Sequence, residues 1–186
     1  MNKINVWDIL VAHVSTLTDY GTDKPDWSAR LLFFGFPLVV ACACVYFSWG
    51  LYLDALNALI AAFAIFAGLL LNLLLLIYTF SNSQAPVDLA KLRTQFTREL
   101  HANISFSVLE SIAIVLVAFV AVVQLKVRDP RNESFLHTGP IVTSLLIYLT
   151  SSFVLTLLMI LKRIHEVLRI ELDHKKSPPA TRLKAS

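Results

Sequence analysis

The sequence predicts an all-α, polytopic integral membrane protein of one domain, with four transmembrane helices and helical extensions on the cytoplasmic side. Hydrophobic residues make up 56% of its 186 residues. Charged residues make up only 16%, whereas a soluble domain of this size carries about a quarter. The charges are also concentrated between long apolar stretches. That distribution is typical of a chain that crosses a membrane several times.

An amphipathic cytoplasmic helix is predicted over residues 1–20, ahead of the first apolar stretch. Trp7 and Val11 fall on one side of such a helix, and Asp8 and Asp19 fall on another. No cleavable signal sequence is recognisable here, so we expect the first span itself to direct insertion. The helix either lies at the membrane surface or caps the other cytoplasmic helices.

Four apolar stretches are each long enough to cross the roughly 30 Å hydrocarbon core of a bilayer, which takes about 20 residues of helix. They cover residues 31–50, 56–80, 104–125 and 140–161. Only a short turn around Gly50 and Asp54 separates the first two stretches. We therefore predict that these two spans form an antiparallel hairpin.

Basic residues are unequally distributed between the two sides of the predicted spans. Thirteen of the 16 Lys and Arg residues flank the termini and the segment between the second and third spans. The other connections hold only Lys126, Arg128 and Arg131. Because Lys and Arg accumulate in cytoplasmic loops, both termini are predicted to be cytoplasmic. Residues 175–186 form a basic tail.

Two predicted spans continue as helices into the cytoplasm. The third span belongs to a helix predicted over 87–126, about 60 Å long at about 1.5 Å per residue, and the fourth to a helix over 140–174. Apolar side chains repeat at helical spacing along both extensions. They are Leu89, Leu92, Phe96 and Leu100 on the first, and Ile164, Leu168 and Leu172 on the second. These stripes either pack together as a two-helix stalk or contact a neighbouring copy or a cytosolic partner.

Glu110 is the one acidic residue inside a predicted span, where a carboxylate is costly unless it has a partner. Asn72 in the second span should lie at a similar depth. Lys162 and Arg163, at the base of the fourth span, can reach inward. We therefore predict an intramembrane polar cluster of these residues, which serves either as a structural hydrogen-bonded group or as a proton or ion relay.

No residue pattern predicts catalysis. The stretch from His165 to Arg169 has an arginine where a zinc-binding HExxH helix requires its second histidine. There is no phosphate-binding glycine loop and no metal-ligand cluster. We therefore expect no enzyme activity, no cofactor and no metal. We also expect no direct binding of nucleic acid, because no binding fold or aromatic interleaving is recognisable.

In its layout, the chain resembles the membrane subunit of the Kiwa anti-phage defence system. The shared features are its short length, four spans, a long helical middle segment from Val87 to Asn103 and a short charged C-terminal extension. The resemblance implies a homo-oligomer, a tetramer, in a bacterial inner membrane. It also implies a sensor of phage attack at the envelope that acts with a cytosolic DNA-binding partner, and it assigns no site residues.

We therefore expect a non-enzymatic sensor and scaffold subunit of a bacterial anti-phage defence system. The alternative is an oligomeric channel or pore-forming effector that depolarises the membrane, for which Glu110 and the hydroxyl-rich fourth span are the suitable features. A third hypothesis is an accessory subunit of a transporter or envelope complex.

Overall fold

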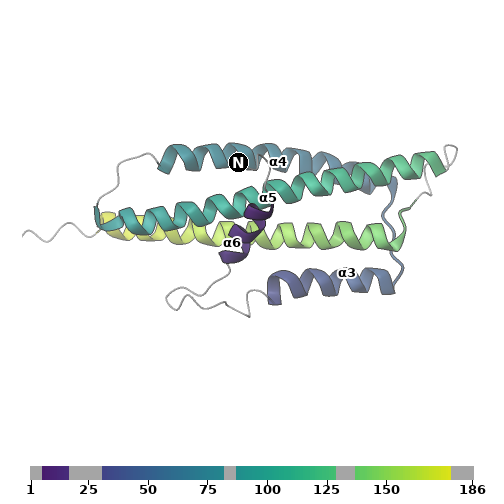
Figure 1. Cartoon of the computed structure of the whole chain (residues 1–186), viewed down its shortest axis with the longest axis horizontal. Helices are drawn as coiled ribbons and strands as arrows, with labels where there is room; N and C mark the ends of the chain where they lie inside the picture. Colours follow the sequence, from purple (N-terminus) through teal and green to yellow (C-terminus); the bar gives the residue numbers. More distant parts are fainter. Residues whose placement is uncertain (1–5, 17–30, 82–86, 129–136, 177–186) are drawn as a thin grey trace, which may run out of the picture.

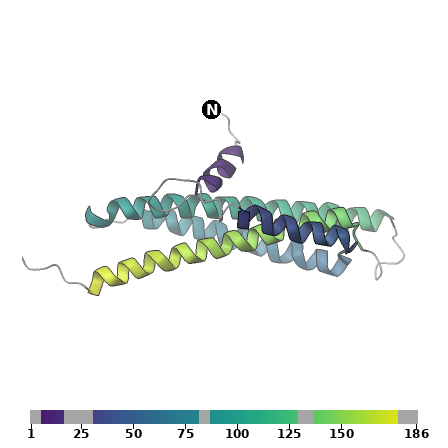
Figure 2. The same cartoon turned by 90° about the horizontal axis from the view of Figure 1, so that it is seen from below.

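The computed structural model describes residues 6–16, 31–81, 87–128 and 137–176. Helices account for nearly all of these residues. They are α1 (Val6–Ser15), a π-helical turn η1 (Leu31–Gly35), α3 (Phe36–Tyr46), α4 (Leu53–Ser81), α5 (Val87–Arg128) and α6 (Pro140–Lys176). Helices α3 to α6 lie along one common axis, and α1 stands off the side of this bundle at an angle (Figures 1 and 2).

Three helices are long and apolar enough to cross a membrane. They include the segments Leu53–Thr79 of α4, Thr94–Val127 of α5 and Pro140–Glu166 of α6. In their most apolar windows only 11%, 39% and 22% of the residues are buried, and many of the exposed residues are large and apolar, which is the arrangement that a lipid solvent favours. The prediction of an all-α chain is confirmed for the described residues, and three of their helices are apolar and long enough to span a membrane.

The first apolar stretch, residues 31–50, forms a shorter helix than the other three. It comprises the 5 residues of η1 and the 11 residues of α3, at most about 24 Å at about 1.5 Å per residue. That length is less than the roughly 30 Å of a bilayer core. Among the described residues, therefore, three helices are long and apolar enough to span a membrane, and a fourth span is not shown.

Helix α3 ends where Ser48 turns the chain. Its φ of 52° lies in the left-handed region, and the amide of Trp49 donates to the carbonyl of Cys44 at 3.0 Å. This is the Schellman type of helix end, with serine in the place that glycine usually takes. The chain leaves α3 in a new direction after this turn.

Helix α3 packs against α6 and not against α4, so the predicted hairpin of the first two spans is wrong. The order across the bundle is α3, α6, α5, α4, and Figure 1 shows α3 and α4 on opposite sides of the central pair. The connection after α3 is held at the start of α6, where the amide of Thr138 donates to the carbonyl of Leu51 at 3.0 Å. Gly50 permits this approach, because a Cβ there would lie 2.6 Å from the carbonyl oxygen of Thr138.

The core lies between α4, α5 and α6. Its buried residues recur every seven positions on two of these helices, as Leu56, Phe63 and Leu70 on α4 and Leu146, Phe153 and Ile160 on α6. The rings of Phe63 and Phe153 meet edge to face with centroids 4.9 Å apart. A repeat of seven matches helices that pack at a shallow angle. In a membrane this interdigitation, and not the exclusion of water, holds such helices together.

The predicted cytoplasmic helices correspond to the ends of α5 and α6. The bounds Val87–Arg128 and Pro140–Lys176 include the predicted ranges 87–126 and 140–174. Figure 2 shows the C-terminal end of α6 diverging from the N-terminal end of α5, so their outermost turns do not form the two-helix stalk. Of the predicted stripes, Phe96 and Leu100 are buried, Ile164 packs against the core and Leu168 is 52% exposed. The side chains of Leu89, Leu92 and Leu172 and the tail from 177 lie outside the described residues.

Candidate functional site

Buried polar side chains follow one face of α5. Asn103, Ser107 and Ser111 are fully buried, Glu110 is 5% exposed and Glu99 is half-buried. The spacing of three and four residues places all of them on the side of the helix that faces its neighbours. An interior face is where a helix that crosses a membrane keeps its polar groups, away from lipid. This face of α5 is the candidate functional site.

Arg163 of α6 ties three helices together at one end of this face. Its guanidinium forms an ion pair with Glu99 of α5. The same group donates a hydrogen bond of 2.8 Å to the carbonyl oxygen of Thr16, just after α1. A cation at a helix C-terminus compensates the partial negative charge of the free carbonyl groups. Arg163 is 6% exposed, so these groups are its surroundings in place of water.

His13 anchors α1 to the same face of α5. Its Nδ1 lies 2.9 Å from Oδ1 of Asn103, and its ring stacks on Phe106 with centroids 4.0 Å apart. The hydroxyl of Thr16 also lies 2.9 Å from Oδ1 of Asn103. Because Oδ1 is an acceptor, the neutral imidazole carries its proton on Nδ1 in this arrangement. We call His13, Thr16, Glu99, Asn103 and Arg163 the clasp.

The pKa of His13 is lowered from its ordinary value. Burial is the main cause, because it disfavours the charged imidazolium, and the positive charge of Arg163 acts in the same direction. The hydrogen bond to Asn103 opposes both effects. The clasp is therefore built around a neutral histidine.

Three buried polar atoms of α5 have no hydrogen-bond partner among the described residues. They are Nδ2 of Asn103, Oγ of Ser107 and Oε2 of Glu110. The carboxyl group of Glu110 does have one partner, the side chain of Ser152 on α6. An unpaired buried polar atom costs about 1–3 kcal/mol, so three on one face form a polar track that favours hydration or a change of partners.

The structure does not assemble the cluster predicted from Glu110, Asn72, Lys162 and Arg163. Asn72 is exposed on the outer side of α4. Lys162 is exposed and pairs with Glu166 at 3.9 Å. Arg163 lies at the level of its ion-pair partner Glu99. Glu110 is 11 residues further along α5, about 16 Å away, so Glu110 and Arg163 do not meet.

The antiparallel register of α5 and α6 explains that separation. Arg163 meets Glu99, and Ser152 meets Glu110. The 11 residues from 99 to 110 on α5 match the 11 residues from 152 to 163 on α6. A basic residue at position 163 therefore reaches the end of the polar face and not its middle.

Sequence reasoning missed most of the clasp. Glu99, Asn103 and Ser107 precede Glu110 at intervals of four, four and three residues, which is a recognisable polar helical face. His13 stands among the apolar residues of the first amphipathic segment. Only its burial to 3% exposure shows that it is a docking residue.

A second feature lies on an exposed face of α4. Small and amide side chains form an exposed stripe there, comprising Asn57, Ala61, Ala64, Gly68 and Asn72. A Cβ at Gly68 would meet nothing within 4 Å. Small residues permit close approach of a second helix, and amides within a membrane gain from partners across such an interface.

The chemistry of these sites is that of docking and of holding helices in register. Among the described residues, no three His, Cys, Asp or Glu side chains come together in a way that could hold a metal ion. Comparisons of the chain with protein-family models, characterised proteins and solved structures found no match.

Proposed function

We propose that this chain is a non-enzymatic sensor and scaffold subunit of a bacterial inner membrane, and that the clasp is its coupling element. The observation that carries the proposal is the position of Arg163, which contacts α1 and α5 from α6. A shift of α6 against α5 within the membrane moves this guanidinium away from Glu99 or from Thr16. Loss of the Thr16 contact removes one of the links that hold α1, which His13 also anchors to Asn103, so a disturbance of the bilayer becomes a change at its surface.

Self-association is the first part of the scaffold role. The stripe on α4 exposes the amides of Asn57 and Asn72, and every residue between these two is apolar or glycine. Packing against the same stripe of a second copy gives these amides partners and lets the backbones approach at Gly68. The layout shared with the Kiwa membrane subunit favours four copies.

A cytosolic protein is the second partner in this proposal. The end of α6 continues beyond its apolar segment and exposes Leu168 beside the exposed Arg169. An amphipathic helix end of this kind suits a groove on a soluble protein. The Kiwa resemblance makes that protein a DNA-binding one, so that contact with nucleic acid belongs to the partner and the chain contributes to anti-phage defence.

In this proposal the segment 31–50 also crosses the membrane, which makes four spans in total, and both termini are cytoplasmic. The unequal distribution of Lys and Arg supports that orientation. Helix α3 also exposes large apolar side chains, among them Leu38, Val39 and Val45. Their solvent in this arrangement is lipid, with local thinning of the bilayer to match a short helix.

Purification of the full chain in mild detergent, together with the product of the adjacent reading frame, tests the scaffold role. We expect an oligomer that retains the soluble partner. Leu168→Glu should abolish that retention, whereas His165→Glu, at another exposed position of the same extension, should not. A monomeric chain that retains no partner contradicts the proposal.

A second candidate, a channel or pore-forming effector, is favoured by the polar track of Asn103, Ser107 and Glu110. Hydrated polar groups on an interior helix face are what a permeation pathway requires. Conductance of liposomes that contain the purified protein separates the two candidates. An ohmic conductance that Glu110→Gln abolishes favours the pore, and silent liposomes favour the sensor.

A further inference from the structure

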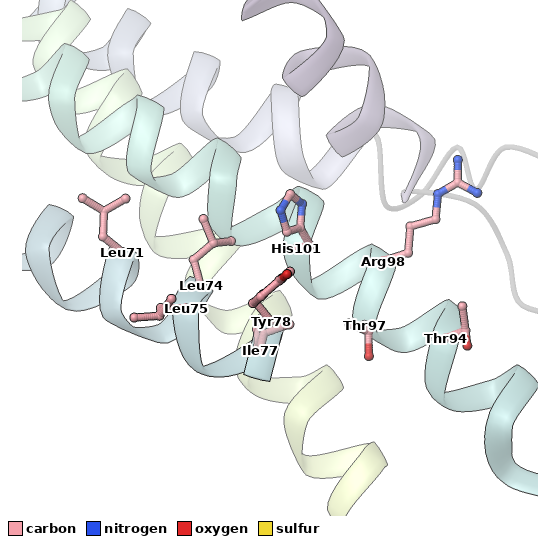
Figure 3. A pocket seen from close by; sticks show the side chains of 9 residues that line it. All are labelled: Leu71, Leu74, Leu75, Ile77, Tyr78, Thr94, Thr97, Arg98 and His101. Carbon is pink, nitrogen blue, oxygen red and sulfur yellow. The ribbon is translucent and has the colours of Figure 1, made fainter. Parts of the chain in front are cut away.

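A pocket of about 550 Å³ lies between the end of α4 and the first part of α5. One wall consists of α4 side chains that include Leu71, Leu75 and Tyr78, and the other consists of α5 side chains that include Arg98 and His101. Figure 3 shows the hydroxyl of Tyr78 directed toward His101 across the pocket, while Arg98 extends away from the leucine wall. The volume falls within the range of about 300–1,000 Å³ that is usual for ligand sites.

The pocket straddles the boundary between the apolar and polar parts of the bundle. No Asp, Glu, Lys or Arg lies between residues 55 and 81 on α4, whereas on α5 Arg98 and Glu99 come just before a stretch from 100 to 109 that holds none. Leu71 and Leu75 are more than half exposed on the α4 side, whereas hydroxyl and basic groups line the α5 side. This change of lining, from leucine to basic and hydroxyl groups, matches the change along a phospholipid from acyl chain to phosphate.

The charge on the polar wall is positive among the described residues. No Asp or Glu lines the pocket. Arg98 forms no ion pair with any described residue, since the neighbouring Glu99 is engaged with Arg163 on the other side of α5. The N–H groups of a guanidinium match the geometry of a phosphate. The imidazole of His101 and the hydroxyl of Tyr78 add hydrogen-bond donors at the same place.

We propose that this pocket binds an anionic phospholipid from the adjacent leaflet. Its phosphate lies against Arg98 and His101, and one acyl chain lies along Leu71 and Leu75. Basic pockets between transmembrane helices near the membrane surface are suited to anionic headgroups. A soluble phosphate would leave the leucine wall without a function, so the lipid is the occupant that uses both walls. The site does not depend on the sensor role.

Native mass spectrometry of the full chain in mild detergent tests the site, with added phosphatidylglycerol or phosphatidylcholine of identical acyl chains. We expect phosphatidylglycerol to be retained in preference to phosphatidylcholine. Arg98→Ala should lower that preference about fivefold, as expected for one cation near a headgroup. Lys126→Ala removes the same charge from the other end of α5 and should leave the preference unchanged. Arg98→Gln serves as a second variant if the alanine variant does not elute as the wild type does.

Three results would overturn the proposal. The first is equal retention of the two lipids by the wild-type chain. The second is the same loss of preference in Arg98→Ala and Lys126→Ala, which would indicate a general effect of net charge. The third is displacement of the lipid by glycerol 3-phosphate at a concentration equal to that of the lipid, which would indicate a soluble anion as the occupant.

Discussion

Replacing Arg163 with methionine removes the side chain that joins α1, α5 and α6. The change leaves Glu99 without its ion-pair partner, and the side chain of Glu99 is only 18% exposed. It also leaves the carbonyl of Thr16 without the donor that lies 2.8 Å away. Removing one partner of a buried ion pair costs about 3–5 kcal/mol. We expect a loss of that size in the free energy of unfolding.

Thermal and denaturant unfolding in detergent measures that loss, and the distance between spin labels on α1 and α6 reports the docking of α1. Lys162→Met is the matched control, because its pair with Glu166 is exposed and is worth about 0.3–0.5 kcal/mol. If Arg163→Met is no more destabilising than Lys162→Met, the clasp does not hold the helices together.

The double variant Glu99→Leu with Arg163→Met separates the two contacts of the guanidinium. Replacing both charges of a buried pair with apolar groups is often neutral or stabilising, so the stability of the bundle should largely return. The docking of α1 should not return, because the carbonyl of Thr16 still lacks its donor. Recovery of both properties would refute the assignment of the Thr16 contact as the link to α1.

Three further predictions concern other parts of the chain. The docking of α1 should weaken as pH falls below 6.5, the ordinary pKa of histidine. Burial lowers the pKa of His13 in the docked state, so the undocked state binds more protons at low pH. Distances between the spin labels, measured against pH, test this, and His13→Gln should show no such dependence. Gly50→Ala should destabilise the protein by about 1–3 kcal/mol through overpacking, since the new Cβ would lie 2.6 Å from the carbonyl of Thr138. Gly139→Ala, with nothing within 4 Å, is its control in thermal unfolding, and equal melting temperatures would contradict the packing argument. Asn72→Leu should weaken self-association by about 0.6–1.7 kcal/mol if the amide bonds across an α4 interface, measured by energy transfer between labelled copies in nanodiscs, and unchanged transfer would exclude this residue from the interface.

Much of the helical content is predictable because its causes are local. The apolar run of α4 and the continuous pattern of α5 each reveal a helix before any contact is known. The short first helix is a partial exception. Its apolar run extends to Trp49, yet the left-handed conformation of Ser48 ends α3 at Tyr46. A hydropathy pattern does not predict this helix end, because the end is caused by the backbone conformation of Ser48 and not by its polarity.

The candidate site was less predictable, because its members come from three helices that are far apart in the chain. Glu110 was recognisable as a buried acid, since a lone carboxylate in an apolar run requires an interior place. The partner of Arg163 was not recognisable. A cation such as Arg163 can reach several levels of a bundle, and only the register of α6 against α5 selects Glu99.

The sequence by itself determined that the chain is helical and that long parts of it are apolar enough for lipid. These properties depend on each segment and its solvent, so neighbouring residues suffice to reveal them. The tertiary structure decided that α3 packs on α6 and that His13 docks on Asn103. Each of these pairings is a choice among many faces and registers of similar hydropathy. The complementarity of particular side chains makes that choice, and it exists only once the helices meet.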